Sequence, residues 1–363
     1  MLVIIRVDAS EKIGSGHVIR CLTLAESLRE NDVTVLFFSR NHPGNLNHLI
    51  INKGFQVVEL PEPDLPFNKI NKEHLKVDKY QDWLGVSEKK DAEETIQYIE
   101  PDKPDWLIID HYSLGKNWEK QMRPFVKNIM VIDDFTDRFH DCDLLLNQNY
   151  SKNNVEFYQD MVSKSTDIFF GPKYALLKQE YAEARKKLRK HNGTVERVLI
   201  FLGGSDPENL TSMAIEALSQ PDLQSIHLDV VIGVNHPNVE KIQNQCSARG
   251  RAKCYTFLPH LANLMIKADM SIGAGGSTTW ERLCLGLPSI VVSTATNQVP
   301  ASLALGEDGI VEYLGKSSNI STEILSKKVY ELVNSPQKLI QQSVSGQKLV
   351  DGMGVQRTMD KIL

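Results

Sequence analysis

The chain has 363 residues, 41% of them hydrophobic and 24% charged, and a formal net charge of −5 at pH 7. These values are ordinary for a globular protein, and the length exceeds what one hydrophobic core usually serves, so we expect two domains. The mild net charge and the scattered Lys and Arg residues argue against a nucleic-acid or anionic-lipid partner, whereas a local basic pocket for phosphate remains compatible with them.

Short apolar runs alternate with helical patterns in the first half of the sequence. Strands are predicted at residues 2–5, 33–38, 106–110, 129–133 and 143–147. Helices are predicted at residues 18–31, 90–100 and 118–127. This alternation predicts a parallel sheet with helices on both faces. Residues 61–89 are predicted to form a long loop or a small excursion over the edge of the sheet.

A glycine-bearing turn, residues 13–17 (IGSGH), lies between the first predicted strand and the first predicted helix. Glycines at 14 and 16 would let the backbone approach a ligand closely, and the amides at a helix start attract anions. The same pattern also suits a tight turn that binds nothing. A complete dinucleotide fingerprint is excluded because Ile19 stands where the third glycine would be.

His17 makes this turn a candidate catalytic site. In the first turn of a helix the dipole disfavours the imidazolium form, which keeps the ring neutral as a general base requires. The alternative is a histidine that only packs the turn. Asp8 is close enough in the sequence to orient the imidazole, to cap the helix, or to pair with Arg20 or Arg6.

A turn and a charged helical stretch at residues 171–192 precede a second series of alternating strands and helices. We place the boundary here and expect domains of residues 1–172 and 173–363. In the second series, strands are predicted at residues 198–202, 228–233, 254–258, 270–273 and 289–293, and helices at 209–218, 237–248, 260–267 and 277–285. Ligands bind beyond the carboxyl ends of strands in open α/β sheets, so two facing halves are expected to hold one ligand between them.

Two more glycine-bearing turns follow predicted strands of the second half. In the earlier one, Gly203 and Gly204 would permit a diphosphate to approach the backbone, while Asp206 and Asn209 also suit a plain turn and helix cap. Both interpretations stay open.

The later turn, residues 275–278, places amides and two hydroxyls at a helix start, which predicts a phosphate seat. Glu281 lies one helical turn further on, where its carboxylate can accept two hydrogen bonds from a ribose diol. The alternative is an acidic residue that complements the helix dipole. Asn297 and Gln298 follow the next strand and are expected to face the same crevice, unless they cap a helix.

The chain resembles the UDP-sugar hydrolases of bacterial pseudaminic-acid biosynthesis, in motifs that run from residue 3 to about residue 300. These motifs include IGSGHVIRCLTLAESL, IIDHYSL, VIDDFTDR, LLNQNY, FLGGSDPENLT and GAGGSTTWERLCLGLPSIVVS. The stretch LPHLANLMIKAD with GAGGSTTWE is also similar to the nucleotide half of the glycosyltransferase that completes lipid II. The resemblance implies an α/β fold of GT-B architecture, with two facing Rossmann-like domains built on parallel sheets.

The resemblance also implies roles for individual residues. His17 matches the catalytic base, and Asn297 and Tyr112 complete the implied catalytic set. The implied substrate- and nucleotide-binding residues are Asp8, Gly14, Ser15, Gly16, Arg20, Gly204, Ser205, Leu258, Gly275, Gly276, Ser277, Glu281 and Gln298.

The implied reaction is attack of water on the anomeric carbon of UDP-2,4-diacetamido-2,4,6-trideoxy-β-L-altropyranose, with UDP leaving. Glycosidases usually need two carboxylates, but a nucleoside diphosphate departs as a stable anion, so one base suffices. A GT-B glycosyltransferase that uses the same donor, a nucleotide-sugar binder and a pyrophosphatase are the alternatives.

No cofactor and no metal is expected. The acidic pair Asp133 and Asp134 and the pair Asp141 and Asp143 suggest a metal site, but each stands at a strand boundary where acidic turn residues are common. The five cysteines show no CxxC spacing. No apolar run is long enough for a membrane span, and a cytoplasmic protein acting on a small UDP-sugar, with UDP as product, is expected.

Overall fold

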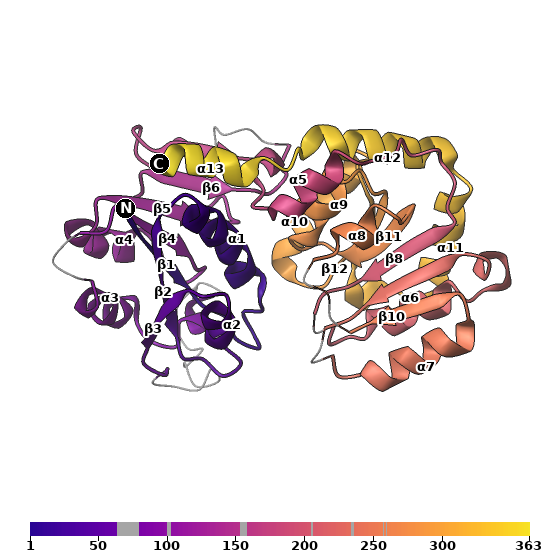
Figure 1. The fold of residues 1–363 in the computed structure, drawn as a ribbon, viewed down its shortest axis with the longest axis horizontal. Helices are drawn as coiled ribbons and strands as arrows, with labels where there is room; N and C mark the ends of the chain where they lie inside the picture. Colours follow the sequence, from indigo (N-terminus) through magenta and orange to yellow (C-terminus); the bar gives the residue numbers. More distant parts are fainter. Residues whose placement is uncertain are drawn as a thin grey trace. The chain divides into compact units, whose positions relative to one another are not determined.

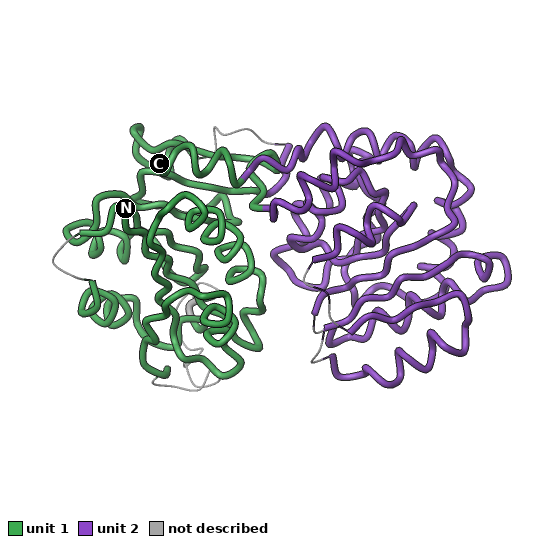
Figure 2. The backbone as a smooth tube through the Cα atoms, viewed as in Figure 1, with its two compact units in different colours: residues 1–148, 153–176, 355–363 green, residues 149–152, 177–354 purple. Residues whose placement is uncertain are grey.

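The computed structural model describes residues 1–63, 80–99, 103–152, 158–204, 206–233, 236–256, 258 and 260–363. The chain forms two compact units, shown in different colours in Figure 2. Unit 1 comprises residues 1–148, 153–176 and 355–363, and unit 2 comprises residues 149–152 and 177–354. We expected a boundary after residue 172, and the chain passes from unit 1 to unit 2 after residue 176. Residues 355–363 were expected in the second domain, but they pack in unit 1.

Seven described strands form the parallel sheet of unit 1 in the order β3-β2-β1-β4-β5-β6-β7 (Figure 1). They are β1 (Leu2–Val7), β2 (Thr34–Arg40), β3 (Gln56–Leu60), β4 (Trp106–Asp110), β5 (Asn128–Ile132), β6 (Leu144–Asn147) and β7 (Asp167–Phe170). The inner strands are buried on both faces, which explains their nearly continuous apolar runs. The edge strands β3 and β7 are only partly buried and were not predicted.

Helices cover both faces of this sheet, as expected. The described helices of unit 1 are α1 (Gly16–Glu30), α2 (Asn47–Asn52), α3 (Glu88–Gln97), α4 (Lys116–Met122) and α13 (Gly354–Ile362), with short 3₁₀ turns η1 (Gln81–Trp83), η2 (Arg123–Phe125) and η4 (Pro172–Tyr174). Val3 and Ile5 of β1 pack with α1 on one face, whereas Ile4 packs with Trp118 of α4 on the other. The alternation follows from the two-residue period of a strand.

Helix α13 completes the core on the α1 face of unit 1. Figure 1 shows it in yellow beside the strands of this unit. Val355, Met359 and Ile362 belong to the same buried cluster as β1, and the indole Nε1 of Trp106 donates to the carbonyl of Ile362 at 3.1 Å. The segment therefore belongs to the hydrophobic core of unit 1 and is not a surface tail.

Unit 2 repeats the architecture with six described parallel strands, in the order β10-β9-β8-β11-β12-β13. They are β8 (Arg197–Phe201), β9 (His227–Val231), β10 (Ala252–Tyr255), β11 (Met270–Ala274), β12 (Ser289–Ser293) and β13 (Glu312–Lys316). The helices are α5 (Gln179–Arg185), α6 (Leu210–Ala217), α7 (Val239–Arg249), α8 (Ala262–Met265), α9 (Thr278–Cys284), α10 (Val299–Glu307), α11 (Thr322–Val333) and α12 (Pro336–Leu349), with η5 (Pro221–Leu223), η6 (Thr296–Gln298) and η7 (Ser317–Asn319).

Both sheets have the strand order of a Rossmann-like fold, so the expected α/β class with parallel sheets is confirmed. In each unit the direction of winding reverses between two neighbouring strands, β1 and β4 in unit 1 and β8 and β11 in unit 2. Ligands of such sheets bind beyond the carboxyl ends of the strands at this point. No helix in the described parts of the chain combines the length and apolar character of a membrane span.

Candidate functional site

His17 lies at the reversal point of unit 1 and is held by the end of a neighbouring strand. Its Nδ1 is 2.6 Å from Oδ1 of Asp110, the last residue of β4. Strands β1 and β4 pair in parallel with Val7 opposite Asp110, which brings this carboxylate to the start of α1. His17 is 7% exposed and Asp110 is fully buried. The ring hydrogen bonds seen among the described residues use Nδ1, so Nε2 is the nitrogen suited to take a proton.

Arg20 binds the same carboxylate from one helical turn further along α1. Its Nε lies 2.6 Å from Oδ2 of Asp110, and one terminal nitrogen lies 2.7 Å from Oδ1. Its other terminal nitrogen contacts both carboxylate oxygens of Asp134 at 3.0 Å. Burial tends to raise the pKa of Asp110, but the charge of Arg20 and the hydrogen bonds from Arg20 and His17 outweigh it and hold this pKa well below its usual range. Asp110 therefore stays ionised and accepts hydrogen bonds.

Tyr112 touches the same imidazole from the segment after β4. The two ring centroids are 4.5 Å apart with an edge-to-face angle of 85°. Its hydroxyl donates to Asp134, and Trp83 stacks on its ring at 5.3 Å. The structure thus brings together three residues that the sequence singled out, His17, Arg20 and Tyr112. It adds Asp110 and Trp83, which sequence reasoning missed, and Asp134, which the sequence suggested only as a candidate metal ligand.

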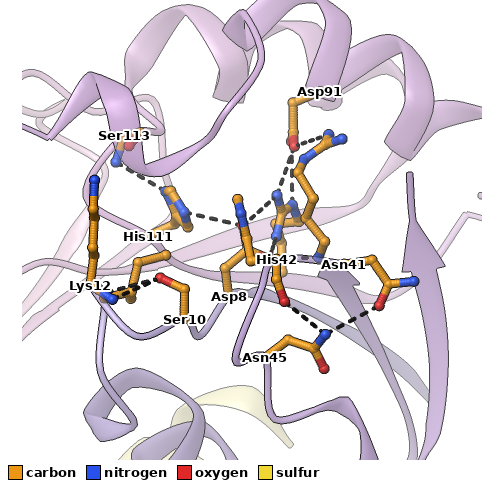
Figure 3. A network of polar contacts seen from close by, with 12 residues as sticks. Asp8, Ser10, Lys12, Asn41, His42, Asn45, Asp91, His111 and Ser113 are labelled. Carbon is orange, nitrogen blue, oxygen red and sulfur yellow. Dashed lines mark hydrogen bonds and ion pairs between the residues drawn. The ribbon is translucent and has the colours of Figure 1, made fainter. Parts of the chain in front are cut away.

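Asp8 requires a correction, because the structure commits it to a buried network instead of His17 or an open binding surface (Figure 3). Arg6 contacts its two carboxylate oxygens at 2.5 and 2.9 Å, and the backbone amide of Arg40 donates to Oδ1 at 2.7 Å. Arg6 and Asp8 project to the same side because they are two residues apart in extended chain. Pairing with Arg6 was one of the alternatives that the sequence left open.

The network around Asp8 reaches the end of β4 through His111. Nδ1 of His111 accepts from the amide of Ser113 at 3.0 Å, and its Nε2 lies 3.2 Å from Oδ2 of Asp8. Burial lowers the pKa of His111, so the neutral ring links the two groups. His111 stands between Asp110 and Tyr112, and its contacts therefore anchor the segment that holds His17.

The Gly14–Gly16 turn is exposed next to this cluster. Gly14 has a φ of +80°, a left-handed conformation that favours glycine, and its amide donates to Ser10 at 2.8 Å. A Cβ at Gly14 or Gly16 would meet no atom within 4 Å. Ser15 precedes α1 without forming a side-chain cap. This backbone is thus exposed, and both interpretations of the turn, ligand binding and a plain tight turn, stay open.

In unit 2, the turn after β8 packs closely against the segment after β9. A Cβ at Gly233 would lie only 2.1 Å from the carbonyl oxygen of Gly204. Asp206 caps α6, since its carboxylate accepts from the amides of Leu210 and Thr211 at 3.0 and 2.8 Å. The turn and cap role that the sequence offered for Asp206 agrees with these contacts. The predicted binding residue Ser205 lies outside the described residues.

The turn at Gly275, Gly276 and Ser277 joins β11 to α9 at the reversal point of unit 2. A Cβ at Gly275 would lie 2.4 Å from Oγ of Ser302 and 3.3 Å from Cβ of Gln298. Gln298 is held there because its Oε1 accepts from the amide of Thr294 at 2.9 Å. The structure thus brings Gln298 beside this turn, and Asn297 precedes it in the same 3₁₀ turn, η6.

Glu281 lies in the first turn of α9 and already has a partner. The hydroxyl of Tyr181 in α5 donates to Oε2 of Glu281 at 2.6 Å. Burial raises the pKa of this carboxyl group. The predicted binding residue Leu258 follows β10 and is half-buried.

The acidic residues considered as metal ligands form ion pairs with cationic side chains. Arg123 pairs with both Asp141 and Asp143, and Asp133 lies 3.2 Å from Nε2 of His140. Within the described ranges, no group of three or more His, Cys, Asp or Glu residues is arranged to hold a metal ion. A cavity of about 390 Å³ in unit 2 lies instead near the amino ends of β8 and β9, and the predicted site residues do not line it.

Unit 2 is similar to a glycosyltransferase domain, and the whole chain is similar to proteins of polysaccharide and UDP-sugar metabolism. Residues 198–353 match the model of the glycosyltransferase family 28 C-terminal domain. The chain is 24% identical over 356 residues to the spore coat polysaccharide biosynthesis protein SpsG of Bacillus subtilis, covering 96% of this chain and 94% of that protein. It is 25% identical over 317 residues to the UDP-2,4-diacetamido-2,4,6-trideoxy-β-L-altropyranose hydrolase of Campylobacter jejuni, covering 86% and 99%.

An uncharacterized protein of Methanocaldococcus jannaschii is 28% identical over 301 residues, 80% of this chain, and the chain spans 55% of that longer relative. Among solved structures, MurG of Acinetobacter baumannii superposes with a TM-score of 0.68 at 14% identity, covering 99% of this chain and 98% of MurG. The glycotransferase of kitacinnamycin gives 0.66 at 16% identity, covering 99% and 97%. The two Rossmann-like units therefore have the GT-B fold.

Proposed function

We propose that this chain cleaves a UDP-sugar at its anomeric carbon with water, releasing UDP and the free sugar. The proposed substrate is UDP-2,4-diacetamido-2,4,6-trideoxy-β-L-altropyranose, an intermediate of pseudaminic acid biosynthesis. The likeness to the Campylobacter hydrolase extends over 86% of the chain and supports this choice. The likeness to SpsG supports a place in surface glycan biosynthesis.

The contact between His17 and Asp110 is the observation that carries the proposal. With Nδ1 engaged by an ionised carboxylate whose pKa is held low, Nε2 takes a proton from water. The water oxygen bonds to the anomeric carbon as the carbon–oxygen bond to the diphosphate breaks, and its electron pair leaves with UDP. Asp110 stabilises the imidazolium ion that forms, in the manner of an orienting carboxylate.

Nucleotide binding is assigned in this proposal to elements of unit 2. The Gly275–Ser277 turn receives the diphosphate and Glu281 the ribose, with Gly204, Ser205, Leu258 and Gln298 as further contacts. The diphosphate is a stable leaving group, so no general acid is required. In unit 1, Gly14, Ser15, Gly16 and Arg20 are assigned to the substrate, and Arg20 acts through Asp110.

Two further residues position the reacting groups in this proposal. Asn297 is assigned to the sugar or the attacking water. Tyr112 fixes the plane of the imidazole, because its ring packs edge-on against His17 while its hydroxyl donates to Asp134.

Transfer of the sugar to a hydroxyl acceptor is the second candidate. The match of residues 198–353 to a glycosyltransferase domain favours it, since the same donor-binding elements would serve. His17 would then deprotonate the acceptor instead of water.

Incubation of the full chain with the proposed substrate in ¹⁸O-labelled water separates the candidates. Label in the free sugar supports hydrolysis at carbon, and label in a phosphate product indicates a pyrophosphatase. UDP release only after addition of an acceptor indicates a transferase. His17→Asn should abolish release of UDP without changing UDP affinity, and His48→Asn, at an exposed histidine of α2, is the matched control.

A further inference from the structure

Two aromatic rings, those of Trp83 and Tyr112, lie next to the imidazole of His17, and those of Tyr80 and Phe135 pack against them. These four residues are here called the aromatic wall. Trp83 stacks on Tyr112 with an angle of 22° between the rings, and its centroid lies 6.2 Å from that of His17. Tyr80 lies 4.8 Å from Trp83 and 5.2 Å from Phe135, which lies 4.7 Å from Tyr112. The rings come from the segment before α3 and from the ends of β4 and β5.

The aromatic wall is fixed to the sheet by contacts of its neighbours. Ser113, three residues beyond β4, donates its hydroxyl to the carbonyl of Tyr80. Leu84, next to Trp83, is 2% exposed and belongs to the hydrophobic core. The guanidinium of Arg138 lies 4.7 Å from the centre of the Phe135 ring and donates to the carbonyl of Tyr112. The aromatic positions are therefore determined by packing and hydrogen bonds.

Three of these four residues retain exposed surface beside a polar cluster. Tyr112 is buried, but Tyr80, Trp83 and Phe135 are only half-buried. Large aromatic side chains contribute most when their faces are covered, so an accessible group of them adjoining a candidate base is typical of a ligand-binding surface.

We propose that the aromatic wall binds the sugar through its apolar substituents and that Trp83 is a specificity-determining residue. This inference rests on the proposed function, because it assigns the sugar to the surface beside His17. Ring faces pack against methyl and C–H groups, but they offer a hydroxyl no replacement for its hydrogen bonds to water. The Tyr112 hydroxyl is engaged by Asp134. The wall thus selects sugars with acetamido and deoxy groups over fully hydroxylated hexoses.

The experiment measures binding in the His17→Asn background, so that neither hydrolysis nor transfer consumes the ligand. The probes are UDP-N-acetylglucosamine and UDP-glucose, which differ in one acetamido group, with UDP as the reference. Titration calorimetry should give an affinity about tenfold higher for the acetamido sugar. Trp83→Leu should reduce this ratio to about one without changing the affinity for UDP, and Trp83→Phe should retain most of it.

Saturation-transfer NMR supplies a second measurement that reports proximity directly. Irradiation of aromatic protons should transfer saturation to the acetamido methyl group, and Trp83→Leu should weaken this transfer relative to the uracil protons. Phe139→Leu is the matched control, because Phe139 is an aromatic residue 55% exposed outside the wall. Phe135→Leu tests the wall independently if Trp83→Leu folds poorly.

The outcomes separate this inference from the proposed function. An affinity ratio near one in the His17→Asn protein, or one that is unchanged by Trp83→Leu in that background, overturns the role of the wall even if the chain hydrolyses its substrate. A ratio that depends on Trp83 supports the wall even if the labelled-water experiment shows transfer instead of hydrolysis.

Discussion

Nδ1 of His17 lies 2.6 Å from Oδ1 of Asp110, although 93 residues separate the two in the sequence. The imidazole is therefore oriented by the end of β4 and not by a residue of its own turn. Because Arg20 shares the carboxylate, the helix that carries the candidate base is tied to the sheet at two points.

Asp110→Asn should impair catalysis and stability together. The amide keeps the shape of the side chain but loses the charge that orients His17 and pairs with Arg20. We expect a fall in kcat on the order of 100-fold, and a loss of about 3 kcal/mol in the free energy of unfolding. Steady-state kinetics and urea unfolding check both values. Asp141→Asn, at a partly exposed ion pair, is the control, and similar losses in both variants would contradict the special role of Asp110.

His140 should make the stability of unit 1 depend on pH. Burial lowers its pKa, but hydrogen bonds with Asp133 and Glu119 outweigh this and raise the pKa to about 9. A histidine with a raised pKa stabilises the folded state fully below its unfolded pKa of about 6.5, and the contribution disappears as pH rises through 9.

The expected loss between pH 6 and pH 10 is about 3 kcal/mol, which is the free energy of a shift of this size. His140→Gln should flatten that part of the profile of unfolding free energy against pH. The control is His227→Gln, at an exposed histidine of β9. Parallel profiles for the parent protein and His140→Gln would show that this histidine carries no such coupling.

Glu281→Gln should weaken UDP binding by about tenfold, because a charge-assisted hydrogen bond to the ribose would be lost. Tyr181→Phe removes only the hydroxyl that now donates to Glu281, so UDP affinity should be kept. Calorimetry with UDP distinguishes the two variants. Glu180→Gln, at the exposed neighbouring position in α5, is the control, and unchanged binding in Glu281→Gln would remove Glu281 from the nucleotide site.

Gly275→Ala should destabilise unit 2, because the new Cβ would lie 2.4 Å from Oγ of Ser302 and close to Gln298. Displacing the turn should cost about 1–3 kcal/mol and should also lower UDP affinity. Gly115→Ala is the matched control, since its Cβ would meet only a side-chain oxygen of Glu88 at 3.8 Å. Thermal unfolding with and without UDP measures both effects, and equal melting temperatures for the two variants would be inconsistent with the tight packing at Gly275.

The inner strands of both sheets could be predicted because burial on two faces leaves a continuous apolar run, as in residues 106–110. The edge strands β3, β7 and β13 were not predicted because they are partly exposed, whereas the edge strand β10 overlaps the strand predicted at residues 254–258. In β3, Gln56 and Glu59 interrupt the apolar pattern, and in β7 a single charged residue leaves only three apolar positions. Such short mixed segments resemble loops by composition alone.

The partner of His17 was missed for a different reason. Sequence reasoning considered residues near it in the chain, above all Asp8, whereas the partner is brought in by pairing of β1 with β4. A usable signal was present, because Asp110 ends an apolar run predicted as a strand, and carboxyl ends of parallel strands meet at one edge. Which two strands are neighbours depends on long-range packing and could not be deduced from local pattern.

The place of helix α13 in unit 1 affects the order in which the two units can fold during translation. The ribosome completes all of unit 2 before it delivers Val355, Met359 and Ile362, which the core of unit 1 contains. Residues 1–176 leave the ribosome early, but their hydrophobic core lacks the side chains of α13 until those residues leave the exit tunnel. Residues 1–176 made as a separate fragment should therefore expose apolar surface and aggregate, and a peptide of residues 354–363 supplied in trans should rescue their solubility.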